Sequence, residues 1–150
     1  MDQIPQRPGV AKIYRTVLMS LERYMIFPFR DPAYYSVAGL LLSIGYLFAR
    51  SLALQVTIIA VILLFDWMDG AVARKYNKTS RAGWLIDVAV DRMSEGIIFA
   101  SLLFTPLGSI FFISYICNIF LSFYSVKAGR HHLLPLRFIW LFILLGKLWM

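Results

Sequence analysis

Four aspartates lie in or at the edges of two apolar stretches, where carboxylates are unfavourable. Asp66 and Asp69 are three residues apart, and Asp87 and Asp91 are four residues apart. On an α-helix, either spacing puts both side chains on one face. Glu95 follows Asp91 by four residues on the same face. Because a charge at the bilayer centre costs at least about 2.5–3.5 kcal/mol, this placement indicates a functional requirement.

Carboxylates that are clustered in this way repel one another unless they are protonated or bind cations. A set of oxygen ligands without His or Cys favours a hard divalent cation such as Mg²⁺ or Mn²⁺. Two alternatives are Arg–Asp ion pairs within the membrane, with Arg92 beside Glu95, and a proton relay. Since four aspartates exceed what the local arginines need, we favour a metal site.

The residues after the first aspartate pair indicate what such a metal could serve. Gly70 and Ala73 are small, and Gly83 precedes Asp87 by four residues, so a ligand or a helix can approach the backbone closely. Arg74 adds a planar donor that suits phosphate. Together they predict a metal-dependent site for a phosphorylated substrate, with a pyrophosphate as the best fit.

The composition predicts an all-α integral membrane protein with a single domain over residues 1–150. The chain is 60% hydrophobic and 16% aromatic, whereas soluble domains are about 45–50% apolar. Each of its apolar runs is close to the roughly 20 residues that a helix needs to cross a bilayer. About five transmembrane helices are therefore predicted, over residues 33–49, 52–72, 84–105, 107–126 and 133–149.

The distribution of Lys and Arg predicts the orientation. With the N-terminus in the cytoplasm, twelve of the 15 basic residues fall at cytoplasmic ends, Arg50 and Lys147 fall outside, and Arg92 lies within a span. Residues 75–83 and 127–135 are then cytoplasmic, and both aspartate pairs lie in the cytoplasmic part of the membrane. The net charge of +7 indicates contact with anionic lipid, and with an anionic substrate, rather than with nucleic acid.

A basic amphipathic segment precedes the first apolar run. Apolar residues recur at spacings of three and four over residues 10–25, with charged residues between them. This pattern favours a helix that lies in the membrane interface, and a partner-binding helix is the alternative. Pro28 and Pro32 then separate an interfacial segment, residues 1–31, from the transmembrane bundle, residues 32–150.

The motif Asp66-x-x-Asp69-Gly70-x-x-Ala73-Arg74, then eight residues, then Gly83-x-x-x-Asp87-x-x-x-Asp91 resembles the signature of the CDP-alcohol phosphotransferases at every position. The resemblance implies a multi-pass membrane enzyme of phospholipid biosynthesis, often a homodimer. Such enzymes transfer a phosphatidyl-type group from a CDP-linked lipid, such as CDP-diacylglycerol, to an alcohol and release CMP.

The resemblance also implies roles for individual residues. It assigns two divalent metal ions to the four aspartates, Asp66, Asp69, Asp87 and Asp91, and makes Asp91 the catalytic base. The residues that would bind the CDP-lipid are Gly70, Ala73, Arg74, Ser80, Asp31, Pro32, Ala33 and Tyr34, with Ala33 where the family commonly has Asn or Asp. Lys127 and Arg137 resemble the basic residues that meet the phosphate of a phosphorylated acceptor, and membrane anchoring is their alternative role.

The resemblance is incomplete at one point. Members of the family usually have six spans, whereas five are predicted here, so both a shortened member and a fragment stay open. Three other classes are alternatives: an intramembrane prenyltransferase, a divalent-cation transporter and an inactive truncated homologue. The continuation Gly70-x-x-Ala73-Arg74 speaks against the first two, and the intact motif speaks against the third. Glycerol 3-phosphate, inositol phosphate and serine all stay open as acceptors.

Overall fold

The computed structural model describes residue 22, residues 27–128 and residues 134–150, and it is helical throughout, with no strand among these residues. The helices are α2 (Ala33–Tyr46), α3 (Leu52–Lys75), α4 (Arg81–Ser101), α5 (Pro106–Ala128) and α6 (Leu136–Trp149). Each helix falls within a few residues of one predicted apolar run. The prediction of an all-α fold is confirmed.

The helix boundaries follow from residues that cap or break helices. The hydroxyl of Ser51 accepts a hydrogen bond from the backbone N–H of Leu54 at the start of α3, at 3.3 Å. Pro32 and Pro135 directly precede α2 and α6. In the first turn of α5, a side chain at Gly108 would collide with the carbonyl of Leu102 at the end of α4, so this close approach requires glycine.

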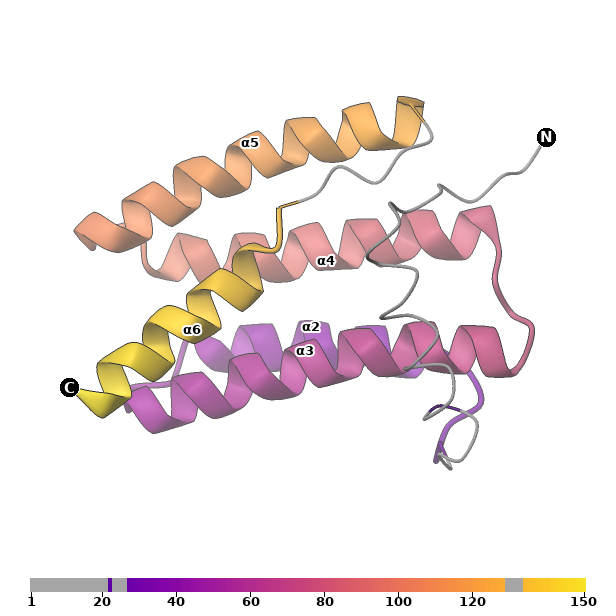
Figure 1. Ribbon diagram of the computed structural model, residues 1–150, viewed down its shortest axis with the longest axis horizontal. Coiled ribbons are helices and arrows are strands. Elements are labelled where there is room, and N and C mark those ends of the chain that lie inside the picture. The colour runs from indigo at the N-terminus through magenta and orange to yellow at the C-terminus, as the bar shows by residue number, and fades with distance from the viewer. Residues whose placement is uncertain (1–21, 23–26, 129–133) are drawn as a thin grey trace.

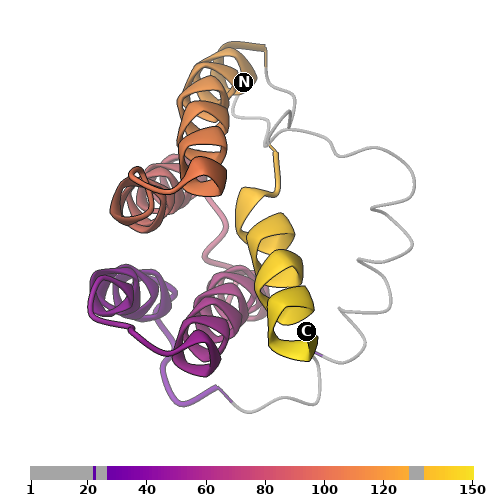
Figure 2. The ribbon, with the colours of Figure 1, turned by 90° about the vertical axis from the view of Figure 1, so that its left-hand side faces the viewer.

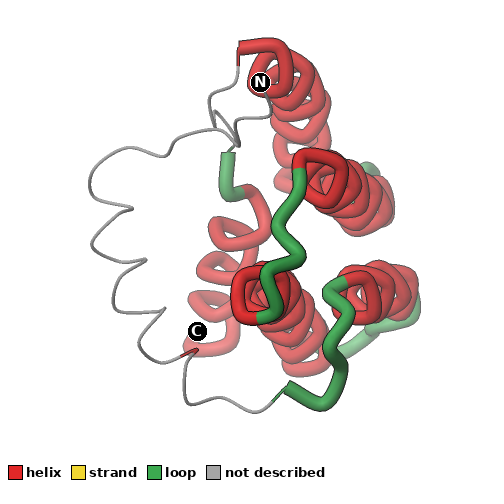
Figure 3. The backbone as a smooth tube through the Cα atoms, turned by 90° about the vertical axis from the view of Figure 1, so that its right-hand side faces the viewer, coloured by secondary structure: helices red, strands yellow, loops and turns green. Residues whose placement is uncertain are grey.

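The helices form two packed pairs, with α6 crossing one of them (Figure 1). Helix α2 packs mainly on α3, α4 contacts α2 and α5, and α6 packs on α3. Seen end-on, α2 and α3 lie below α4 and α5, and α6 runs beside α3 (Figure 2). The loop that joins α3 to α4 lies at the same end of the molecule as the segment that leads into α2 (Figure 3).

An aromatic cluster packs α2, α4, α5 and α6 together, away from the loop that joins α3 to α4. Trp140 on α6 packs against Phe99 of α4 and Phe111 of α5, with ring centroids 6.3 and 5.0 Å apart. The indole N–H of Trp140 also donates a hydrogen bond to the hydroxyl of Tyr46 on α2, at 3.0 Å. This core fixes four helices relative to one another, and the polar site lies toward their other ends.

Two stretches, Leu52–Lys75 and Pro106–Ser125, are long and apolar enough to cross a membrane, and α2 is a shorter apolar helix. Large apolar side chains also point outward, such as Phe120 and Phe123 of α5 and Phe104 before it. A large apolar surface of this kind fits lipid contact. A crossing by all five helices stays a prediction.

The predicted interfacial helix, residues 10–25, lies outside the described residues except for Glu22. Glu22 is buried. The next described residue, Phe27, is also buried and belongs to an apolar cluster with Tyr35, Ala71 and Val72. Phe27 therefore packs against the start of α2 and the end of α3.

Candidate active site

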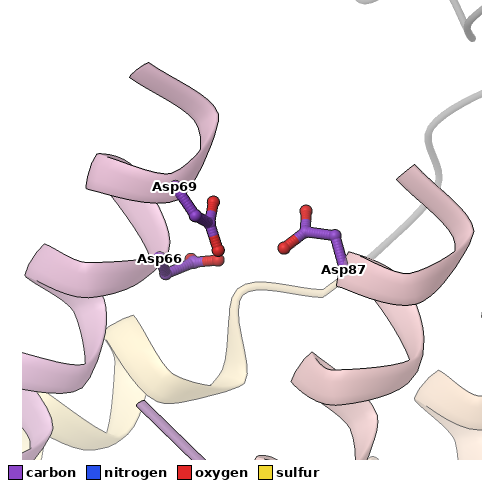
Figure 4. A group of neighbouring side chains, drawn as sticks. All are labelled: Asp66, Asp69 and Asp87. Atoms are coloured by element: carbon purple, nitrogen blue, oxygen red, sulfur yellow. The ribbon is translucent and has the colours of Figure 1, made fainter. Parts of the chain in front are cut away.

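Three of the predicted carboxylates converge between α3 and α4. One oxygen each from Asp66, Asp69 and Asp87 lies within 4.8 Å of the other two. Figure 4 shows the first two extending from one helix toward Asp87 on the facing helix. The predicted i,i+3 spacing on α3 produces one half of this cluster, and α2, which packs on both α3 and α4, places Asp87 of α4 opposite it.

Helix α2 adds a hydroxyl to the cluster. The Oγ of Ser36 donates a hydrogen bond to Oδ2 of Asp69, at 2.9 Å. Asp69 is the buried member of the three, while Asp66 and Asp87 are partly exposed. The hydrogen bond fixes the orientation of the Asp69 carboxylate and leaves its other oxygen available.

Asp91 lines the same cavity but takes a different partner. Its Oδ1 lies 2.5 Å from Nη2 of Arg137, which belongs to the first turn of α6 and is almost fully buried. The same guanidinium nitrogen lies 3.5 Å from Oδ2 of Asp66, and the guanidinium Nε lies 3.9 Å from Oε1 of Glu95. The predicted group of four thus divides into three clustered aspartates and one that pairs with Arg137.

The charges of the cavity do not balance. Four carboxylates and one guanidinium, that of Arg137, line it, which leaves an excess of three negative charges if all are ionised. Arg–Asp pairing therefore explains Asp91 but not the cluster as a whole. Oxygen ligands of this number and charge fit a divalent cation such as Mg²⁺ or Mn²⁺.

Arg74 lies one turn after Gly70 on α3 and binds Glu22. Its Nε is 3.1 Å from Oε2 and its Nη2 is 2.5 Å from Oε1 of that carboxylate. A Cβ atom at Gly70 would lie 3.0 Å from Nη1 of Arg74, so glycine leaves the guanidinium room to lie along α3. Glu22 was not predicted to take part in the site, because it belongs to the segment expected in the interface.

The other predicted substrate residues lie around the loop that joins α3 and α4. Ser80 caps α4, and its Oγ accepts a hydrogen bond from the N–H of Gly83 at 2.9 Å. Asp31 accepts a hydrogen bond from the N–H of Ala33 at 3.2 Å and lies 3.7 Å from Nζ of Lys78. Of the remaining residues, Pro32 directly precedes α2, Tyr34 is exposed and Ala73 is partly exposed.

The two basic residues predicted to meet an acceptor phosphate have different surroundings. Lys127 is exposed in the last turn of α5. Arg137 is buried against Asp91. Arg137 is therefore the one of the two that lines the cavity with the aspartates.

Three residues of the site carried no recognisable sequence signal. Ser36 and Ser94 both line the cavity. Ser94 is buried, and its hydroxyl finds no hydrogen-bond partner within the described part of the chain. Asn118 is fully buried on α5 and donates a hydrogen bond to Glu95 at 3.3 Å. The suggested pair of Arg92 and Glu95 is present, at 2.7 Å.

A model of the CDP-alcohol phosphatidyltransferase family matches residues 32–146. The match covers most of the chain and includes Asp66, Asp69, Asp87, Asp91 and Glu95, so this protein belongs to that family. Members of the family are integral membrane proteins that generally use divalent metal ions. Membership removes the prenyltransferase and transporter interpretations of the motif.

Individual relatives match a shorter part of the chain. Phosphatidylinositol phosphate synthases of Mycobacterium marinum and Mycobacterium tuberculosis are each 39% identical to it over 70 residues. The aligned residues make up 45% of this chain but only 28% and 30% of those proteins. No solved structure is significantly similar to the chain.

Proposed function

We propose that this protein transfers a phosphatidyl-type group from a CDP-linked lipid to an alcohol and releases CMP. The observation that carries the proposal is the cluster of Asp66, Asp69 and Asp87, in which the family signature folds into one oxygen-rich site. The similarity to phosphatidylinositol phosphate synthases makes an inositol phosphate the first acceptor to test.

In this proposal the clustered aspartates hold the metal. Asp66, Asp69 and Asp87 supply carboxylate oxygens, with Asp91 at the edge of the same cavity. Two Mg²⁺ or Mn²⁺ ions are expected from the family resemblance. Such ions, when bound, would offset the negative charge of the donor diphosphate and of the departing CMP.

Asp91 acts as the base. The acceptor hydroxyl oxygen forms a bond to the phosphorus of the lipid-linked phosphate, and its proton passes to the Asp91 carboxylate. The bond from that phosphorus to the bridging oxygen breaks, and this oxygen leaves with CMP. Arg137 holds the carboxylate in place through the 2.5 Å contact. We propose one direct displacement without a covalent enzyme intermediate, because no Cys or His among the described residues lines the cavity and the Ser36 hydroxyl donates its hydrogen bond to Asp69, a proposed metal ligand.

The direct test is release of CMP from radiolabelled CDP-diacylglycerol by membranes that contain the protein. Inositol phosphate, glycerol 3-phosphate and serine are supplied in turn. We expect CMP release that requires both a divalent cation and one of the acceptors. Full activity in excess chelator would contradict the metal site, and CMP release without any acceptor would contradict the transfer.

The donor is proposed to bind at Gly70, Ala73, Arg74 and Ser80, close to residues 31–34. Replacing Arg74 by lysine keeps the positive charge but loses the planar guanidinium with its paired N–H donors. Hydrogen bonds to charged groups contribute about 1.5–3 kcal/mol to the binding free energy. We expect the KM for the CDP-lipid to rise about tenfold or more, because 1.4 kcal/mol is a factor of ten. Steady-state kinetics with varied CDP-lipid measure this effect.

Two further variants make the donor test specific. Gly70→Leu is expected to block the same site, because even a Cβ atom there reaches within 3.0 Å of Arg74. Arg81→Lys, at an exposed position at the start of α4, is the matched control and should behave as wild type. Normal KM values for both Arg74→Lys and Gly70→Leu would place the donor elsewhere.

We also propose that all five helices cross the membrane and that the aspartates open toward the cytoplasm. The asymmetry of basic residues supports this orientation. Single cysteines at Thr79 and Phe104, both exposed, should react with a membrane-impermeant maleimide from opposite sides, after Cys117 is replaced by serine. Thr79→Cys should react from the cytoplasm. Reaction of both cysteines from one side would contradict the assignment of α4 as a span.

A further inference from the structure

Asn118 uses both ends of its side-chain amide to hold the residue just before α6. Its Nδ2 donates to the carbonyl oxygen of Leu134 at 3.0 Å, and its Oδ1 accepts from the N–H of Leu134 at 2.9 Å. The chain then passes through Pro135 into α6. An amide offers a donor and an acceptor side by side, which neither a hydroxyl nor a carboxylate can reproduce here.

The same amide reaches α4. Nδ2 of Asn118 also donates to Oε2 of Glu95 at 3.3 Å, and both side chains are almost completely buried. Arg92 contacts the same Oε2 at 2.7 Å, while the other oxygen of Glu95 lies 3.9 Å from Nε of Arg137. Asn118 and Glu95 thus connect α4, α5 and the start of α6. We refer to these two residues as the Asn118–Glu95 clasp.

Arg137 lies three residues after Leu134 and points back into the aspartates. Its guanidinium faces Glu95 on one side and Asp91 and Asp66 on the other, at 2.5 and 3.5 Å. The clasp fixes both the backbone that carries Arg137 and one of the carboxylates that the guanidinium faces. The position of this buried positive charge therefore depends on Asn118, although Asn118 does not line the cavity.

We propose that Asn118 is a positioning residue that holds Arg137 against Asp91 and Asp66, where its charge limits how tightly the cluster binds a divalent cation. The inference rests on the proposed function, because it takes the aspartates as metal ligands. Like charges within a few ångströms repel strongly where water is scarce. A guanidinium fixed at Asp66 therefore opposes a cation at the same carboxylate, and a displaced guanidinium does so less.

The test is Mn²⁺ binding to the purified full chain in detergent, with free Mn²⁺ measured by electron paramagnetic resonance. Arg137→Met is expected to tighten Mn²⁺ binding by about tenfold, from the loss of one nearby positive charge. Asn118→Ala is expected to tighten it in the same direction by a smaller factor. In the double variant, Asn118→Ala should add nothing further, because the charge that it positions is gone.

Matched variants separate positioning from general damage to the fold. Ser122→Ala, one turn along α5, removes a buried hydrogen bond to the backbone of Asn118 at 2.7 Å but leaves the side-chain amide intact, so it should bind Mn²⁺ as wild type does. Asn118→Ser keeps a polar group but not the paired donor and acceptor, and it should resemble Asn118→Ala. If Asn118→Ala fails to fold, Mn²⁺ binding by Asn118→Ser tests the proposal instead.

The possible failures are distinguishable. Absence of Mn²⁺ binding by the wild-type chain would overturn the proposed metal site, and the inference with it. Normal binding by the wild type together with weakened or unchanged binding by both Asn118 variants would overturn the inference alone. Additive effects of Arg137→Met and Asn118→Ala would do the same.

Discussion

Replacing Asp91 by asparagine is expected to lower turnover about 10²–10⁴-fold, which is the range that a positioned acid–base group contributes. Asparagine has the same shape but cannot take the proton of the acceptor hydroxyl. Asp91→Asn also removes one negative charge from the cavity, so Mn²⁺ binding should weaken, but by less than in Asp69→Asn, because Asp91 lies outside the three-carboxylate cluster. The affinity for CDP-lipid should change little. CMP release, measured at saturating acceptor and donor, gives the loss of turnover.

The ion pair between Asp91 and Arg137 requires a control. Asp91→Asn also leaves a buried guanidinium without its nearest carboxylate, which could disturb the site by itself. Asp91→Asn combined with Arg137→Met removes both charges. If Asp91 is the base, turnover stays lost in the double variant. Substantial turnover by either variant would contradict the base assignment.

Replacing Asp69 by asparagine is expected to weaken Mn²⁺ binding by more than about 100-fold, and turnover should fall with it. Loss of an outer-shell partner alone typically costs 10–100-fold in metal affinity, and a direct carboxylate ligand should cost at least as much. Asp69 is also the most buried of the three clustered aspartates. Electron paramagnetic resonance with Mn²⁺ measures the binding, and added Mn²⁺ should restore part of the turnover.

Ser36→Ala is the matched variant for Asp69. It removes only the 2.9 Å hydrogen bond that orients the carboxylate, so it should weaken Mn²⁺ binding in the same direction by about 10–100-fold. Unchanged Mn²⁺ binding in Asp69→Asn would show that the metal, if any, binds elsewhere. An equal loss in both variants would mean that the orientation of Asp69 matters as much as its charge.

The clustered aspartates were predictable because the information about them is local. The i,i+3 spacing of Asp66 and Asp69 needs only an α-helix, and the short connection to α4 keeps Asp87 at the same end of the molecule, although α4 packs on α2 rather than on α3. Apolar runs bounded by Ser, Pro and Gly likewise predicted the helices to within a few residues. The segment before α2 could not be assessed in this way, since only Glu22 of residues 10–25 is described.

The remaining contacts of the site join residues that are far apart in sequence. Ser36 meets Asp69 from 33 residues away, and Asn118 meets Glu95 from 23 residues away. A buried serine or asparagine on an apolar helix carries no signal that names its partner, because the partner depends on how the helices pack. The same holds for Arg74, which was predicted to face phosphate and lies against Glu22, 52 residues away.

Helix α2 has 14 residues and begins at the depth of the aspartates, with Ser36 in its first turn. A helix of this length is about 21 Å long, against a hydrocarbon core of about 30 Å. If α2 crosses the membrane, the bilayer thins around it or the polar boundary lies closer to its first residues. Water and lipid headgroups then reach the carboxylates at the same depth. A charged acceptor dissolved in water and a donor dissolved in lipid can meet there without either leaving its own phase.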